Sequence, residues 1–143
     1  MTVTLRTATD TDHAAVNARY ADIGFVPSRA GELIVIATLS GCVAGQGRVV
    51  PVDARSGELG GTYVLPDFQG HGVARRIVDF LIHHTQLSVL YCLPFGQMQN
   101  FHRLMGFVPV KQQDRVPQQV LQKHQWCNAN YDKPVLLLER IET

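Results

Sequence analysis

The chain has 143 residues, of which 45% are hydrophobic and 17% are charged, and its formal net charge at pH 7 is +1. This length and composition predict one globular domain with a single core, and they exclude a fibrous or disordered chain. The near-zero charge, without a Lys/Arg-rich run, argues against a nonspecific nucleic-acid binder.

The first half of the chain reads as a strand, a helix and then three strands in succession. Residues with alternating polarity or with branched apolar side chains mark the strands, and Ser40-Gly41 marks a hairpin turn. The predicted elements are a strand at 3–6, a helix at 12–23, a hairpin formed by 32–39 and 42–50, and a strand at 58–65.

The second half alternates helices with short strands. Apolar residues recur at helical spacing from Val73 to His84, so this helix should pack on a sheet. The elements that follow are a strand at 88–92, a helix at 97–105, a strand at 107–111, a short helix at 117–123 and a strand at 134–141. The strand, helix, strand order around 73–84 predicts a crossover between parallel strands.

One segment joins a strand directly to a helix through a glycine loop. It runs from Val64 through Pro66, Gly70 and Gly72 to Arg76. Helix N-termini carry unpaired N–H groups and partial positive charge, and glycines let a phosphate approach them closely. A phosphorylated ligand is therefore expected at residues 69–74.

Two motifs in the chain resemble those of the GNAT superfamily of acyl-CoA-dependent N-acyltransferases. The first is a strand ending in Val-x-Pro, followed by Gln/Arg-x-x-Gly-x-Gly/Ala, which Val64, Pro66, Gln69, Gly72 and Ala74 match. The second is the Phe-Tyr-x-x-x-Gly-Phe signature, which residues 101–107 resemble, with His102 at the Tyr position.

The resemblance implies the fold: an α/β (α+β) arrangement in a single GNAT-like domain over 1–143. Its mixed, mostly antiparallel sheet would have six to seven strands flanked by helices. The strands at 58–65 and 88–92 would splay apart, with the pantetheine arm of the ligand between them. The residues that would contact acetyl-CoA are Val64, Leu65, Gln69, Gly70, His71, Gly72, Val73, Ala74, Arg75, Asn100 and His102.

The implied reaction moves an acetyl group from acetyl-CoA to a primary amine by direct attack in a ternary complex. The backbone N–H of Leu65 would polarise the thioester carbonyl. His102 would protonate the leaving thiolate, and an unperturbed pKa near 6.5 would make that activity fall above neutral pH. Glu58, six residues before Val64 and so on its face of the strand, would take the amine proton, with Glu32 and Tyr63 as weaker substitutes.

Several alternatives stay open. The thiolate can leave unassisted, with His102 in a positioning or structural role. The acceptor is a small-molecule amine or a peptide or protein amine, and the protein is a monomer or homodimer. A second hypothesis is a CoA-binding sensor or partner module that no longer catalyses acetyl transfer, because His102 stands where the family has Tyr. A third hypothesis is a nucleotide-binding enzyme that uses the same glycine loop.

Other features of the sequence bear on location and metal. The three cysteines show no paired spacing, and the polar residues 1–12 lack the apolar core of a signal peptide, so a cytoplasmic protein is expected. The apolar runs are far shorter than the roughly 20 residues that span a bilayer. His124 and Cys127 have no second ligand pair, so no metal site is expected.

Overall fold

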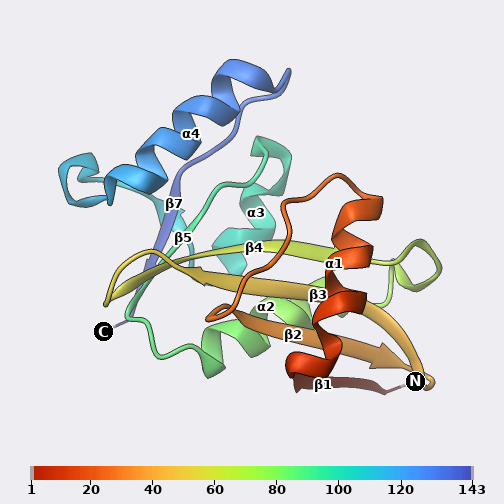
Figure 1. The fold of residues 1–143 in the computed structure, drawn as a ribbon. Coiled ribbons are helices and arrows are strands. Elements are labelled where there is room, and N and C mark those ends of the chain that lie inside the picture. Colours follow the sequence, from red (N-terminus) through yellow and green to blue (C-terminus); the bar gives the residue numbers. More distant parts are fainter. Residues whose placement is uncertain (1, 143) are drawn as a thin grey trace. The chain divides into compact units, whose positions relative to one another are not determined.

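The computed structural model describes residues 2–142 (Figure 1). Four α-helices and seven strands alternate along the chain. The helices are α1 (His13–Asp22), α2 (Val73–His84), α3 (Gln99–Leu104) and α4 (Gln118–Asn130). The strands are β1 (Val3–Thr7), β2 (Leu33–Leu39), β3 (Cys42–Pro51), β4 (Ser56–Val64), β5 (Val89–Cys92), β6 (Val108–Pro109) and β7 (Leu138–Ile141).

Hydrogen bonding orders the strands β1-β2-β3-β4-β5-β7-β6. β4 and β5 are parallel, whereas the β1–β2, β2–β3, β5–β7 and β6–β7 pairs are antiparallel. The predicted mixed, mostly antiparallel sheet is therefore confirmed, as is the parallel pair around α2. The chain divides into two compact units, residues up to 50 with 59–85 and residues 51–58 with 86 onward.

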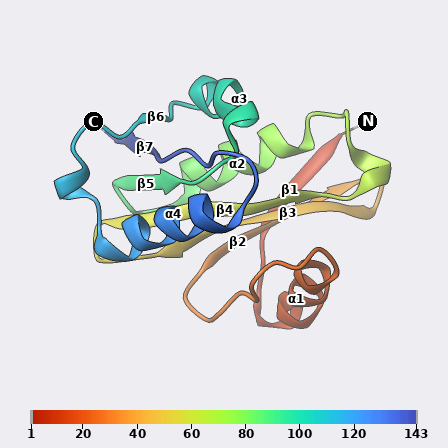
Figure 2. The same cartoon turned by 90° about the horizontal axis from the view of Figure 1, so that it is seen from above.

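The first unit is a β-sheet covered on both faces. Figure 2 shows α1 and α2 on opposite sides of β2 and β3. Val16 and Tyr20 of α1 are fully buried and pack on Ile34 of β2, and burying each such side chain stabilises the fold by about 1.5–3 kcal/mol. On the other face, a Cβ on Gly47 of β3 would lie 2.6 Å from Ile77 of α2. The glycine therefore allows α2 to lie close against the strand.

The second unit is built on β5. Ser56, Gly57 and Glu58 of β4 pair in register with Val89–Tyr91, and β7 pairs along the other edge of β5. The parallel ladder ends at Glu58, although β4 continues to Val64. Buried apolar side chains from β5, from the region of α4 and from the approach to β7 form its core: Tyr91, Val116, Val120 and Leu137.

Three predicted elements in this unit have different lengths in the structure. The helix predicted at 117–123 extends to Asn130, and only Val120 and Cys127 in it are buried. Its last turns are supported by side-chain hydrogen bonds within the helix, from Asn128 to His124 and from Asn130 to the carbonyl oxygen of Trp126. The strand predicted at 107–111 is reduced to Val108–Pro109, where proline has no N–H for a ladder. The strand predicted at 134–141 begins at Leu138, and the residues before it make only an isolated bridge, Phe95 to Val135.

Candidate functional site

The glycine loop between β4 and α2 has the conformation that its sequence predicts. Pro66 begins a short 3-10 turn, and Gly70 and Gly72 follow with φ of +83° and +76°. These are left-handed conformations that residues with a Cβ adopt only with strain. A Cβ on either glycine would have no heavy atom within 4 Å. The loop is therefore open at both positions.

The N-terminus of α2 has no side-chain cap. Gly72 is the N-cap and has no side chain that could satisfy the first amides of the helix. The first turn contains Val73, Ala74 and Arg75 and no acidic residue. Val73 points into the core, whereas Arg75 is exposed, as are Gln69 and His71 in the loop. The backbone amides of this turn thus combine with the positive end of the helix dipole.

The backbone amide of Leu65 is already engaged, which contradicts its predicted availability to a ligand. It donates to the carbonyl oxygen of Ala44 at 2.8 Å, within the first unit. In an extended strand, successive N–H groups point to opposite edges, so the N–H of Val64 points away from β3. The Gln69 side-chain amide donates to the carbonyl oxygen of Val64 at 3.2 Å on that same edge. The amide of Val64, and not that of Leu65, is therefore the candidate for contact with a ligand.

Glu58 is paired with a cation that sequence reasoning did not find. The Nζ of Lys123 on α4 lies 2.7 Å from Glu58 Oε2, and the carboxylate side chain is only 16% exposed. Lys123 is 65 positions away in the chain, so no local spacing could have revealed the pair. The side chains of Glu58 and Val64 can also no longer be assigned to the same face of β4 from their spacing. Gly61 between them has a φ of +61°, which interrupts the alternation of side chains.

His102 lies on α3 with its side chain buried. Its Nδ1 is 2.9 Å from the carbonyl oxygen of Met98, so Nδ1 carries a proton and donates it. The rings of Phe101 and Phe107 meet the imidazole edge to face. Burial lowers the pKa of His102 below its ordinary value. The ordinary value therefore does not hold for this histidine, and its neutral form is favoured. The other candidate on α3, Asn100, is exposed.

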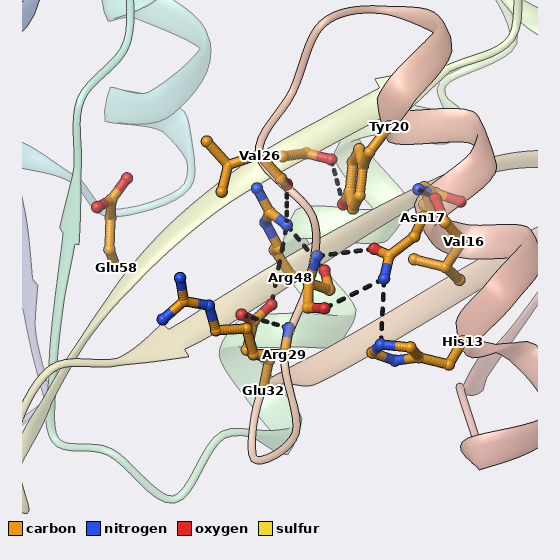
Figure 3. Close-up of polar contacts among 12 residues, drawn as sticks. His13, Val16, Asn17, Tyr20, Val26, Arg29, Glu32, Arg48 and Glu58 are labelled. Carbon is orange, nitrogen blue, oxygen red and sulfur yellow. Dashed lines mark hydrogen bonds and ion pairs between the residues drawn. The ribbon is translucent and has the colours of Figure 1, made fainter.

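A polar network centred on Arg48 was not predicted from the sequence (Figure 3). Arg48 projects from β3 and donates through Nη1 to the carbonyl oxygen of Val26 and to Ser28 Oγ, each at 2.8 Å. Its guanidinium carbon lies 4.4 Å from the centre of the Tyr20 ring. The Tyr20 hydroxyl donates to the carbonyl oxygen of Gly61 at 2.7 Å, and burial raises the pKa of Tyr20 to about 12.

Two further observations concern residues 2–142 as a whole. None of the helices in this range combines the length and apolar character needed to cross a membrane. Within the same residues, His, Cys, Asp and Glu side chains form no group of three or more that could hold a metal ion. Cys42 is an exposed free thiol, and Cys92 and Cys127 are buried ones.

The fold is a mixed sheet flanked by helices, with an open glycine loop before the uncapped N-terminus of α2. The chain belongs to the acetyltransferase (GNAT) family, whose model matches residues 4–107. A comparison with curated proteins found no significant match.

Solved structures with the same fold include several complexes with coenzyme A. N-acetylglutamate synthase from Neisseria gonorrhoeae, complexed with coenzyme A and N-acetyl-glutamate, has a TM-score of 0.69 and 19% identity over 100% of this chain. This chain covers only 36% of that enzyme. Rv2747 from Mycobacterium tuberculosis, in complex with CoA and NLQ, has a TM-score of 0.73 and 19% identity, covering 98% of this chain and 99% of that one. YncA from Salmonella typhimurium, with acetyl-CoA, has a TM-score of 0.67 and 17% identity, covering 100% and 95%.

Proposed function

We propose that the protein transfers an acetyl group from acetyl-CoA to a primary amine, with a small-molecule acceptor favoured over a peptide or protein. Membership of the acetyltransferase family supports this activity. Structures of similar proteins bound to coenzyme A or acetyl-CoA support the co-substrate. The observation that carries the proposal is the open glycine loop at the uncapped N-terminus of α2.

The loop accounts for recognition of the pyrophosphate of CoA. Its negative charge would sit on the amides of residues 69–74, where each helix-dipole contact is worth about 0.3–1 kcal/mol. Arg75 and Arg76 are exposed on the first turns of α2 and would steer the nucleotide phosphates. The N–H of Val64 would pair with the pantetheine arm, and the Gln69 side chain would release the Val64 carbonyl for the same purpose.

The chemistry requires little beyond positioning. The amine nitrogen attacks the thioester carbonyl, a C–N bond forms, the C–S bond breaks and the electron pair leaves with the sulfur of CoA. A fixed backbone N–H stabilises the oxyanion without reorganisation. Val64 now takes this role in place of Leu65. Glu58 stays the proposed base for the amine proton, and Lys123 holds one of its two carboxylate oxygens.

His102 fits poorly with a role as general acid. A buried imidazole with a lowered pKa is mostly neutral at pH 7, and its one proton is donated to the Met98 carbonyl. We therefore propose that the CoA thiolate leaves without protonation by His102. The same neutral His102 is the observation that favours the second candidate function, a CoA-binding module without turnover.

Release of CoA from acetyl-CoA in the presence of an amine panel tests the proposed function. Thiol release would be followed by a chromogenic reagent, and the product would be identified by mass spectrometry as an amine heavier by one acetyl group. Turnover with at least one amine is the expected result. Tight binding of acetyl-CoA without turnover of any amine would favour the binding module. A cytoplasmic location and the oligomeric state remain predictions.

A further inference from the structure

Arg48 has hydrogen-bonding capacity that the fold does not use. Its side chain is only 11% exposed. A guanidinium has five N–H donors, but both hydrogen bonds that Arg48 makes within residues 2–142 come from Nη1. Nη2 and Nε are therefore available to an acceptor group that is not part of residues 2–142.

The nearest carboxylate does not fill this position. Glu32 Oε2 accepts the backbone N–H of Arg29 at 3.0 Å. Glu32 Oε1 lies 3.9 Å from Arg48 Nη1, too far for a hydrogen bond, and has no hydrogen-bond partner although the side chain is only 7% exposed. Glu32 Oε1 is thus a buried acceptor without a hydrogen bond, and it forms a long ion pair with Nη1 of Arg48, the nitrogen that is already hydrogen-bonded to Val26 and Ser28 (Figure 3).

Gly61 lets the guanidinium lie directly against β4. A Cβ on Gly61 would be 2.9 Å from Arg48 Nε and 2.7 Å from the Tyr20 hydroxyl, so any other residue would displace both groups. Gly61 precedes Val64 by three positions, which is roughly 10 Å of extended strand. Arg48 thus lies within the first unit, a short way along β4 from the amide proposed to hold the thioester.

The charges of this network and the exposed residues next to it favour the binding of an anion. Arg48 forms an ion pair with Glu32, whose Oε2 accepts only the backbone N–H of Arg29, so the three side chains together carry one excess positive charge. Arg29 is exposed, and the neighbouring Phe25 and Val26 are 42% and 68% exposed. The segment between α1 and β2 thus surrounds a partly buried arginine with a cation and apolar surface, an arrangement suited to a small organic anion.

We propose that Arg48 binds a carboxylate of the acceptor, which makes the acceptor an amine that also carries a carboxylate, such as an amino acid. The planar guanidinium matches a carboxylate with two parallel hydrogen bonds from Nη2 and Nε. This assignment rests on the proposed acetyl transfer, because it defines the second substrate of that reaction.

The test compares amino acids with their carboxamides, which share the amine but lack the anion. The wild type should show a kcat/KM at least about 10-fold higher for acids than for the matched amides, since charge-assisted pairs contribute roughly 1.5–3 kcal/mol. Arg48→Lys keeps the charge but loses the planar pair, and should reduce this ratio about 10-fold, because the kcat/KM should fall much more for the acids than for the matched amides. Arg115→Lys, at an exposed position on another segment, is the matched control and should leave the ratio unchanged.

Two results would overturn the proposal. One is an equal kcat/KM for acids and amides in the wild type. The other is an equal loss for both substrates in Arg48→Lys, which would show that Arg48 only holds the segment containing Val26 and Ser28. The dissociation constant of acetyl-CoA should not change in this variant.

A binding experiment decides the assignment even if no amine is acetylated. The side-chain Nε–H resonance of Arg48, identified through its loss in Arg48→Lys, is followed in ¹⁵N spectra during titration of the CoA complex with the same acids and amides. A shift with acids alone supports the subsite. The absence of a shift with every acid contradicts it. If acetyl-CoA itself does not bind, the proposed function fails, and the titration of the free protein still tests Arg48.

Discussion

The backbone N–H of Leu65 donates to the carbonyl oxygen of Ala44 at 2.8 Å, and so joins the end of β4 to β3. This bond occupies the amide that the sequence alone would assign to the thioester. Because neighbouring amides of a strand point to opposite edges, the same bond directs the N–H of Val64 away from β3. One hydrogen bond therefore selects which of two adjacent amides can serve a ligand.

A proline at position 65 would distinguish the role of the Leu65 amide from that of the Val64 amide. Leu65 has a φ of −62°, a value that proline adopts, so Leu65→Pro removes the N–H. The proline ring also takes the place of the hydrogen that meets the Ala44 carbonyl oxygen, and it pushes the ends of β3 and β4 apart at this point. The loss of the bond to Ala44 should lower the free energy of unfolding by about 1–3 kcal/mol. The value of kcat should stay near that of Leu65→Ala, the control for the lost side chain. A fall in kcat of about 100-fold or more relative to Leu65→Ala would return the oxyanion role to Leu65.

Substitutions of Glu58 and of Lys123 should lower kcat to different extents. Glu58→Gln removes the proposed base and should lower kcat by about 100-fold or more. Lys123→Met removes only the group that holds the carboxylate and should lower kcat less, by roughly 3- to 10-fold as an order of magnitude for lost positioning. Lys111→Met, at another exposed lysine, should have no effect. Full activity of Glu58→Gln with a primary amine would exclude Glu58 as the base.

The lowered pKa of His102 predicts how both the stability and the activity of the protein depend on pH. Its pKa in the folded protein is lowered by burial, so below the ordinary value near 6.5 the unfolded chain binds more protons than the folded one. The contribution of His102 to stability is therefore present above pH 6.5 and is lost as the pH falls toward the lowered value. Chemical denaturation at several pH values should show this loss in the wild type and a smaller one in His102→Asn.

The activity profile tests the same residue independently. If the thiolate leaves without protonation by His102, kcat should not fall between pH 7 and 9, and His102→Asn should retain kcat within about 3-fold, below the 100-fold typical of acid–base catalysis. A descending limb near neutral pH that disappears in His102→Asn would show that the imidazolium is the acid after all.

The buried hydroxyl of Tyr20 should contribute to the stability of the first unit. Tyr20→Phe removes the hydroxyl that donates to the Gly61 carbonyl but keeps the buried ring. The free energy of unfolding should fall by about 0.5–1.5 kcal/mol. Since burial raises the pKa of Tyr20 to about 12, the wild type should also lose stability as the pH rises above 10, where the unfolded tyrosine ionises first. Tyr20→Phe should lack that part of the alkaline loss.

The sequence predicted the elements whose signals are local. The hairpin at Ser40-Gly41, the glycine loop and the apolar face of α2 each depend on a few neighbouring residues, and all are present. The length of α4 was missed because its exposed polar residues carry no periodic pattern; only Val120 and Cys127, one buried position every two turns, mark its inner face.

The parts of the candidate site that depend on distant residues could not be predicted. Lys123 meets Glu58 only because α4 returns to the start of β4 within the second unit. Arg48 is one arginine in an apolar strand until Val26, Ser28 and Glu32 fold over it. The pKa of His102 depends on burial, which no spacing of residues encodes.

Binding of acetyl-CoA measured by calorimetry tests the central claim most directly, with two glutamates placed at equivalent backbone positions. Gly72 and Gly41 both have left-handed φ values, +76° and +80°, and a Cβ on either would have no heavy atom within 4 Å. Gly72→Glu and Gly41→Glu therefore impose similar strain and the same charge, but only the first enters the loop before α2. The account predicts acetyl-CoA binding in the wild type and in Gly41→Glu, and its loss in Gly72→Glu. Unchanged binding in Gly72→Glu, or no binding in the wild type, would contradict it.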